Sequence, residues 1–332
     1  MNILFFGSFQ HYSTKIAQAL LDDPNITLMG IVTTPPRPAG RDRNLKKTHT
    51  HEWAENLSSS GGTKLPVFTP DKHDRQDLAM IESTLDPLYE SNDPAKKRID
   101  FLVVAGYSEK LTPIFLKYPK HAPLNLHPSL LPAYRGVRPA EFALLFDEIE
   151  TGATVIIMSE KFDTGPIIDQ QKLKIDNKDT REILYQKLYK LEIKIILEAV
   201  KNWENVHKFS RNQPIESTTP YARKLTKEDG FIDWQTLTEA MHAQEIAIPM
   251  HLHKSFQLPT TVESIERTHR ALYNYPGMWT NTQTSKGPKR LKLLELSIFH
   301  PKGERPRLHL DKVQLEGKMP SSFNQIKTIL NT

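Results

Sequence analysis

The sequence predicts an α/β fold in which an open, Rossmann-like and mostly parallel sheet is followed by a smaller OB-like β-barrel domain. The chain opens with two short apolar, β-branched runs at residues 2–6 and 26–33, separated by a helix-like segment at 13–22. An opening of strand, helix and strand gives parallel strands joined by a right-handed crossover. Near the end of the chain, short strand-like runs alternate with Gly/Pro turns, which is typical of a small barrel or sandwich. At 332 residues the chain has the length of two domains rather than one.

The remaining elements of the first domain follow from local patterns. Apolar runs predict five further strands, at residues 65–68, 101–105, 122–127, 153–158 and 167–174. Residues 138–147 are predicted to be helical. Residues 180–203 predict the longest helix, because apolar side chains recur there at helical spacing and Asp179 with Glu182 can cap its start. Residues 82–100 are polar and predict a loop insertion.

The last third of the chain predicts a separate domain. Residues 206–222 mix Ser, Thr, Asn and Pro without periodicity and predict a linker. Beyond the linker we expect short strands at residues 230–234, 277–282, 290–298 and 306–315. A helix is expected at 236–246, whereas residues 247–270 have no pattern that assigns them. The predicted division is a first domain at residues 1–205, a linker at 206–222 and a C-terminal domain at 223–332.

Composition excludes several classes of protein. The chain has no cysteine, so disulfides, thiolate nucleophiles and cysteine-ligated metal sites are excluded. No apolar run approaches the ~18 residues that a membrane span needs, and the chain begins directly with a strand-like run rather than a signal sequence. We therefore expect a cytoplasmic protein with no membrane partner. The sequence also lacks the Gly-rich motifs of dinucleotide and P-loop sites.

The net charge of +5 is unevenly distributed. Residues 211–332 hold 17 Lys/Arg and 12 Asp/Glu, so this part alone carries the whole excess. Such asymmetry is typical of proteins with a polyanionic partner, although a basic surface without a specific ligand gives the same count.

Two polar residues lie at the predicted end of a central strand. Asn125 and His127 are two residues apart, so on a strand their side chains project to the same face. Pro128 cannot continue the ladder and ends the strand there, at the edge where open α/β sheets bind ligands. An amide donor beside an imidazole suits a reaction that builds negative charge on a carbonyl oxygen. Taken alone, the pair is also what an ordinary strand end with a satisfied histidine would give.

A second motif, Asp163-Thr164-Gly165, lies between two predicted strands and is by itself ordinary turn chemistry. The combination is more specific. The run from Asn125 to Gly136 (NLHPSLLPAYRG), followed by this Asp-Thr-Gly, resembles the folate-dependent formyltransferase family.

The resemblance implies transfer of a formyl group from 10-formyltetrahydrofolate to an amine. It implies that Asn125 and protonated His127 stabilise the tetrahedral oxyanion, while Asp163 orients His127 and helps to relay the amine proton. It also implies a folate-binding run made of Ser129, Leu130, Leu131 and Pro132. Because a neutral amine is already a nucleophile, we expect neither a metal nor a covalent enzyme intermediate.

The loop at residues 33–47 (TTPPRPAGRDRNLKK) indicates the acceptor. It directly follows the second predicted strand and carries a cluster of basic residues, which are Arg37, Arg41, Arg43, Lys46 and Lys47. The run Arg37–Arg41 resembles the basic loop with which the family members that act on methionyl-tRNA contact the acceptor stem, and Arg41 matches the arginine of that loop. The expected function is therefore formylation of initiator methionyl-tRNA in translation initiation, by a monomeric enzyme. Two alternatives stay open: an N-formyltransferase acting on a nucleotide-linked amino sugar, and a tRNA-binding protein without catalysis.

Overall fold

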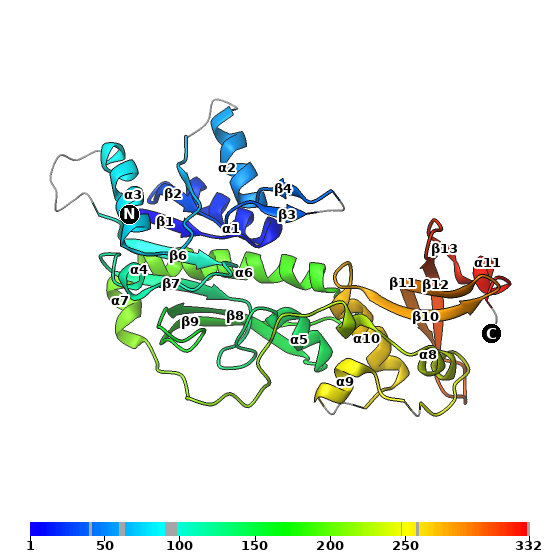
Figure 1. The fold of residues 1–332 in the computed structure, drawn as a ribbon. Helices are drawn as coiled ribbons and strands as arrows, with labels where there is room; N and C mark the ends of the chain where they lie inside the picture. Colours follow the sequence, from blue (N-terminus) through cyan, green and yellow to red (C-terminus); the bar gives the residue numbers. More distant parts are fainter. Residues whose placement is uncertain (40–41, 60–63, 90–97, 247, 257–258, 331–332) are drawn as a thin grey trace. The chain divides into compact units, whose positions relative to one another are not determined.

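The computed structural model describes residues 1–39, 42–59, 64–89, 98–246, 248–256 and 259–330 (Figure 1). Within these residues the chain forms two compact units. The first contains residues 1–139, 150–174 and 185–222, and the second contains 140–149, 175–184 and 223–332. The units are thus interleaved along the chain, and residues 206–222 belong to the first of them. The division at residues 205 and 222 into two domains and a linker stays a prediction.

The first unit is built on a seven-stranded sheet of order β5-β2-β1-β6-β7-β8-β9 (Figure 1). Its strands are β1 (Asn2–Phe6), β2 (Thr27–Val32), β5 (Val67–Phe68), β6 (Phe101–Ala105), β7 (Ala122–His127), β8 (Glu150–Ile157) and β9 (Ile167–Lys174). The five strands from β5 to β7 in this order are mutually parallel, and β8 and β9 are antiparallel to their neighbours. The expected mostly parallel α/β sheet is confirmed, and each of its seven strands overlaps a predicted segment, although β8 begins at Glu150 rather than at residue 153.

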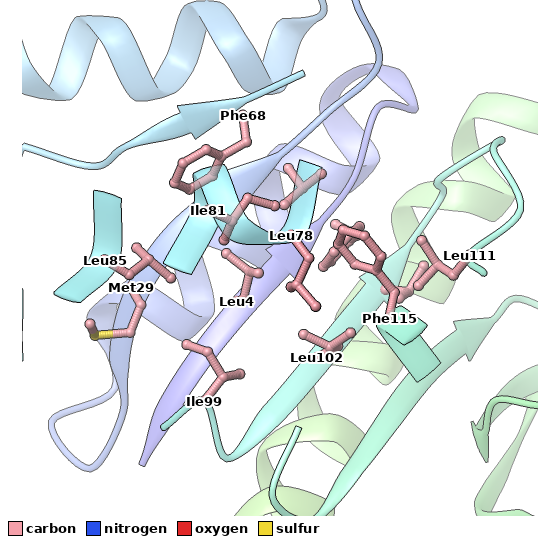
Figure 2. Packing of buried hydrophobic residues seen from close by; sticks show 13 residues of the cluster. Leu4, Met29, Phe68, Leu78, Ile81, Leu85, Ile99, Leu102, Leu111 and Phe115 are labelled. Carbon is pink, nitrogen blue, oxygen red and sulfur yellow. The ribbon is translucent and has the colours of Figure 1, made fainter. Parts of the chain in front are cut away.

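Helices cover both faces of this sheet. On one face, alternate residues of β1 and β6, such as Leu4 and Leu102, pack against α3 (Arg75–Leu85) and α4 (Pro113–Leu116) (Figure 2). On the other face, the Phe101 ring packs edge-on against Trp203, which begins α7 (Trp203–Val206). Strands covered on both faces read as continuous apolar runs, which is why β6 could be recognised in the sequence.

Three further helices belong to this part of the chain. They are α1 (Gln10–Asp22), α2 (His49–Ser59) and the long α6 (Arg181–Lys201). The segments 13–22 and 180–203 are confirmed as helices, and residues 138–147 contain α5 (Pro139–Leu145). The loop expected at 82–100 is wrong at its start, because α3 continues to Leu85 and a 3₁₀ turn follows at Asp86–Leu88. The apolar positions Leu78, Ile81 and Leu85 keep helical spacing into that polar stretch and bury its inner face.

The second unit contains a four-stranded antiparallel sheet of order β10-β11-β12-β13. Its strands are β10 (Met278–Thr284), β11 (Gly287–Phe299), β12 (Arg307–Leu315) and β13 (Ser321–Ser322). Its helices after residue 222 are α8 (Trp234–Met241), α9 (His251–Phe256), α10 (Val262–Leu272) and α11 (Phe323–Lys327), and most of α5 also belongs to this unit. The expected small β domain is confirmed as a separate antiparallel sheet, and in the described part of the chain β10 and β13 are its edges rather than a closed barrel seam.

Two local expectations for the second unit need correction. The strand expected at 230–234 is a 3₁₀ turn (Glu228–Gly230) followed by a single bridge from Phe231 to Trp279. The Asp233 side chain accepts a hydrogen bond from the Gln235 N–H and starts α8 at Trp234, which ends the extended run. The unassigned segment 247–270 contains α9 and most of α10.

Candidate active site

The carboxyl end of β7 carries the two polar residues expected there. Asn125 is half-buried and His127 is 4% exposed, and both belong to the strand itself. Asn125 pairs with Val104 on β6 and with Ile156 on β8, so it lies in the middle of the sheet. Residues i and i+2 of a strand share a face, and the two side chains therefore project to the same side at this edge.

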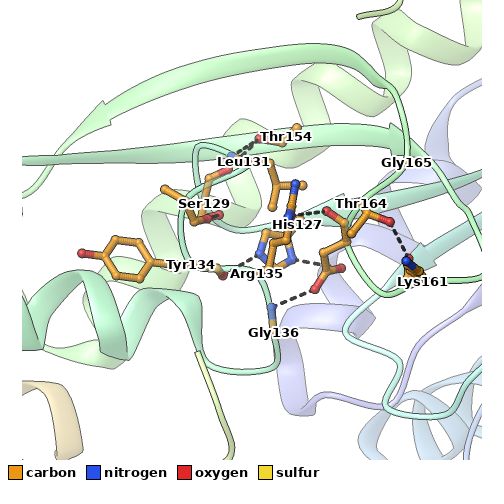
Figure 3. Close-up of polar contacts among 12 residues, drawn as sticks. His127, Ser129, Leu131, Tyr134, Arg135, Gly136, Thr154, Lys161, Thr164 and Gly165 are labelled. Carbon is orange, nitrogen blue, oxygen red and sulfur yellow. Dashed lines mark hydrogen bonds and ion pairs between the residues drawn. The ribbon is translucent and has the colours of Figure 1, made fainter. Parts of the chain in front are cut away.

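His127 is held between two acceptor oxygens (Figure 3). Its Nδ1 lies 3.5 Å from the Asp163 Oδ1, and its Nε2 lies 3.1 Å from the backbone carbonyl oxygen of Tyr134. Carboxylate and carbonyl oxygens can only accept, and only the doubly protonated imidazolium donates from both ring nitrogens. An imidazolium at this position would thus have an acceptor at each ring nitrogen, and a donor of this kind can stabilise a developing oxyanion.

Asp163 is held firmly in an uncommon backbone conformation. Its φ is +56°, a region that Asp adopts more readily than most residues. The Gly136 N–H donates to its Oδ2 at 2.8 Å (Figure 3), and its backbone carbonyl accepts from the Arg135 Nε at 3.2 Å and from the Gln213 Nε2 at 2.9 Å. One bond to the carboxylate and two to the backbone carbonyl thus fix Asp163 beside the imidazole, as expected where the surroundings over-determine a strained residue.

Arg135 joins the loops around this pair. Its guanidinium also donates to the carbonyl oxygens of Pro214 at 2.7 Å and Ile215 at 2.9 Å, and to the side chain of Gln213. The side chain is almost completely buried. A single arginine therefore ties the segment after β7 to the Asp163 turn and to residues 213–215.

The predicted folate-binding run 129–132 forms a tight loop after β7. The Thr154 hydroxyl of β8 donates to the Ser129 carbonyl at 2.6 Å and accepts from the Leu131 N–H at 3.2 Å (Figure 3). The Gln170 amide of β9 donates to the Leu131 carbonyl and to the Thr154 hydroxyl, each at 2.9 Å. The loop conformation is thus set by two polar side chains from the antiparallel strands.

Two side chains of this loop point into the protein. The Ser129 hydroxyl is buried and donates to the Ala133 carbonyl at 2.6 Å, and Leu131 packs with Ile156 and Ile167 in a small apolar cluster. Leu130 and Pro132 are partly exposed. A ligand at this loop would therefore contact its backbone, Leu130 and Pro132 rather than the side chains of Ser129 and Leu131.

The predicted RNA-binding loop forms a short antiparallel hairpin, β3 (Arg37–Ala39) and β4 (Asn44–Lys46). Arg37 pairs with Glu109 at 2.5 Å and Lys47 pairs with Glu55 at 2.6 Å. Arg43 and Lys46 are exposed, whereas Arg41 lies outside the described residues.

The topology brings this hairpin and His127 to one edge of the sheet. β2 and β7 are parallel strands separated by β1 and β6, so their carboxyl ends lie on the same side. Three inter-strand spacings of about 4.8 Å lie between β2 and β7, so the ends of these two strands are about 14 Å apart.

Two kinds of feature are absent from the described part of the chain. No group of three or more His, Asp or Glu residues that could hold a metal ion occurs among the described residues. Within the same residues, no helix has the length and apolar character needed to cross a membrane.

No sequence pattern predicts a role for Thr154, Gln170, Arg135 or Gln213. Each acts by bonding to backbone groups of a loop that is distant in sequence. Arg135 alone left a signal, because an arginine inside a largely apolar, proline-rich run needs buried partners.

An α/β sheet with an imidazole at the carboxyl end of a central strand, and a carboxylate beside it from a nearby turn, has the groups that transfer of an acyl-type group needs. A comparison with protein-family models identifies the family: the Formyl transferase model matches residues 1–200. The chain belongs to this family.

Its curated relatives include methionyl-tRNA formyltransferases. The one from Ehrlichia ruminantium (strain Welgevonden) is 34% identical over 233 residues, which cover 70% of this chain and 69% of the relative. The one from Thermodesulfovibrio yellowstonii is 32% identical over 232 residues, covering 70% of this chain and 68% of the relative. The one from Caulobacter vibrioides is 28% identical over 294 residues, covering 89% of this chain and 81% of the relative. This chain is thus a formyltransferase, and its relatives at 28–34% identity include enzymes named methionyl-tRNA formyltransferase.

Solved structures with a similar fold include other formyltransferases. A 4-N formyltransferase from Francisella tularensis superposes with a TM-score of 0.56 at 16% identity, covering 89% of this chain and 96% of the other. An N-formyltransferase from Helicobacter canadensis, in complex with folinic acid and dTDP-3-aminofucose, gives a TM-score of 0.53 at 15% identity, covering 90% of this chain and 88% of the other. At these identities the likeness shows the fold alone.

Proposed function

We propose that this enzyme transfers the formyl group of 10-formyltetrahydrofolate to the free amino group of initiator methionyl-tRNA, with Asn125, His127 and Asp163 as its catalytic residues. The observation that carries the chemistry is the buried His127–Asp163 pair beside Asn125 at the end of β7. The acceptor is supported by the relatives named methionyl-tRNA formyltransferase and by the basic hairpin at the same edge of the sheet.

The reaction needs one nucleophile and one stabilised oxyanion. The neutral amine attacks the formyl carbon, the carbon–nitrogen bond forms, and the carbonyl electrons move onto oxygen. Asn125 and the cationic His127 donate to that oxygen, while Asp163 holds the ring and takes part in moving the amine proton. Collapse of the tetrahedral species breaks the bond to folate nitrogen, which leaves as the amine once protonated.

The Tyr134 carbonyl has a defined place in this scheme. It faces the Nε2 of His127, which is also the donor that the formyl oxygen would use. The substrate oxygen would thus compete with a backbone carbonyl for one proton, and the interaction strengthens only when that oxygen becomes negative. An interaction that is stronger in the transition state than in the ground state raises kcat.

The acceptor assay tests the proposal. Purified enzyme with 10-formyltetrahydrofolate should formylate methionyl-tRNA and leave nucleotide-linked amino sugars unchanged. The reverse preference would replace the acceptor while keeping the site, and a protein that binds tRNA but formylates neither substrate would be a binding protein.

The catalytic assignment is tested by Asn125→Ala and Asn125→Asp. Loss of one oxyanion donor typically lowers kcat by roughly 10²–10³-fold. The aspartate variant keeps the shape of the side chain but places a negative charge beside the developing oxyanion, so we expect it to be at least as impaired as the alanine variant. Equal urea unfolding midpoints for wild type and both variants would show that the loss is not a folding defect. Unchanged kcat in both variants would remove Asn125 from the mechanism.

A further inference from the structure

Three large apolar side chains are exposed around Asp163. Val137, Phe162 and Tyr221 are 51%, 49% and 55% exposed, respectively. Phe162 precedes Asp163 in the chain, and Val137 follows Gly136, whose N–H donates to the Asp163 carboxylate. Exposed apolar residues are common singly, but these three stand on the segments that hold the Asp163 carboxylate, and they are called the apolar patch below.

Tyr221 reaches the same place from a third segment. A methyl group added at Gly136 would lie 2.9 Å from the Cζ of the Tyr221 ring, so the ring lies against Gly136. Partial burial and then the negative charge of Asp163 raise the pKa of the Tyr221 hydroxyl, which places that hydroxyl within the field of the carboxylate.

The backbone under this patch is rigidly cross-linked. The Ala222 carbonyl accepts from the N–H groups of Val137 at 2.8 Å and Arg138 at 3.0 Å, and the Ala222 N–H donates to the Arg135 carbonyl at 2.7 Å. Gly136, with φ +121°, lets the two segments approach, because a Cβ there would lie 2.6 Å from the Ala222 carbonyl oxygen. The backbone that carries Val137 and Tyr221 is therefore fixed by these bonds.

Covalent geometry decides what this surface can contact. On an aminoacyl acceptor, the side-chain Cβ is two bonds from the attacking nitrogen, or about 2.5 Å away. An amine placed for attack within reach of His127 and Asp163 therefore brings its side chain against the immediate surroundings of Asp163. Apolar surroundings favour an apolar side chain and disfavour a charged or polar one, which would lose its hydration without gaining a partner.

We propose that Val137, Phe162 and Tyr221 form the surface that receives the amino-acid side chain of the acceptor and select an apolar, unbranched one. This inference rests on the proposed function. Methionine fits this chemistry, because its thioether is flexible and makes favourable contacts with aromatic rings. The terminal base of the RNA is the competing occupant, and the experiment below separates the two.

The test compares one initiator tRNA charged with methionine and with alanine, in wild type, Phe162→Ala and Tyr221→Ala. If the patch receives the side chain, each variant lowers kcat/KM for the methionyl substrate roughly tenfold and leaves the alanyl substrate nearly unchanged, since alanine has little side chain to lose. Equal losses for both substrates would overturn the inference and assign the patch to the RNA or to general positioning.

Phe209→Ala is the matched control. Phe209 is 83% exposed and lies in the 3₁₀ turn His207–Phe209, so its truncation should leave the ratio of the two substrates unchanged. A change of that ratio in Phe209→Ala equal to that in Phe162→Ala would also count against the proposal. Failure of the proposed function is distinguishable, because wild-type enzyme would then not formylate methionyl-tRNA at all.

Discussion

Glu192 offers the sharpest test of the energetics of the first unit. It lies on α6 with no exposed surface, and neither carboxylate oxygen has a hydrogen-bond partner within the described part of the chain. The Tyr12 hydroxyl of α1 is similarly buried and is the polar group that acts on this carboxylate, although no hydrogen bond of normal length joins the two within those residues. Burial raises the pKa of Glu192 from 4.5 to about 8, opposed only in part by the neighbouring Tyr12 hydroxyl. The pKa of the Tyr12 hydroxyl is raised as well, first by burial and second by the negative charge of Glu192.

The sign of the pH effect follows from proton binding. Between pH 4.5 and about 8 the folded protein keeps Glu192 protonated while the unfolded chain has lost that proton. The folded state binds more protons there, so stability falls as pH rises through this window and levels off above it. At about 1.4 kcal/mol per pH unit, the full penalty is about 5 kcal/mol.

Glu192→Gln keeps the shape of the side chain and cannot ionise. Urea unfolding of wild type and variant should be compared at several pH values from 5.5 to 8.5. The variant should gain stability relative to wild type by about 3 kcal/mol across this range, because most of the penalty develops within it. Any cost of burying the amide is independent of pH and cancels in this comparison.

Glu198→Gln on the exposed side of the same helix is the control and should show no such trend. The reasoning would be refuted if the stability difference between Glu192→Gln and wild type stayed constant within about 0.5 kcal/mol from pH 5.5 to 8.5. This limit is about one third of the ~1.4 kcal/mol that one pH unit contributes. The carboxylate would then be hydrated or paired in solution.

Three other changes test the site. Thr154→Val removes the hydroxyl that joins two backbone groups of the loop after β7. We expect urea unfolding to show a loss of about 1–3 kcal/mol of stability, together with weaker folate binding. Unchanged folate affinity would show that the loop holds its shape without this hydroxyl. Gly165→Ala would place a Cβ 1.7 Å from the Ile157 carbonyl oxygen, so the turn has to move at a cost of roughly 2 kcal/mol or more, measurable as a lower unfolding midpoint. Replacing Arg43 and Lys46 by alanine should weaken tRNA binding and make the plot of log K against log salt shallower by about 1.5, with folate affinity unchanged; an unchanged slope would place the phosphates elsewhere.

Some features of the fold could be predicted from the sequence alone. Strand β6 is buried on both faces, and a strand of that kind must be apolar throughout, so Phe101–Ala105 was predicted at its observed bounds. The β3–β4 hairpin was missed, since Arg37, Pro38 and the residues of β4 are exposed and form no apolar run, and its pairing depends on two segments meeting. Helix α10 was missed as well, although Thr261 and Ser264 cap its start reciprocally, because that cap lacks the Glu or Gln usual at this position.

The sequence by itself determined which groups can do chemistry: the amide and imidazole of β7, their position at a strand end, and the carboxylate of a turn 36 residues beyond the histidine. Only the tertiary structure decided that His127 and Asp163 meet, that Arg135 and Gln213 hold the backbone carbonyl of Asp163, and that Tyr221 lies against Gly136. The reason is physical. Strand and helix patterns arise from neighbours along the chain, whereas these contacts join segments that are brought together only when the sheet forms and buries their polar groups.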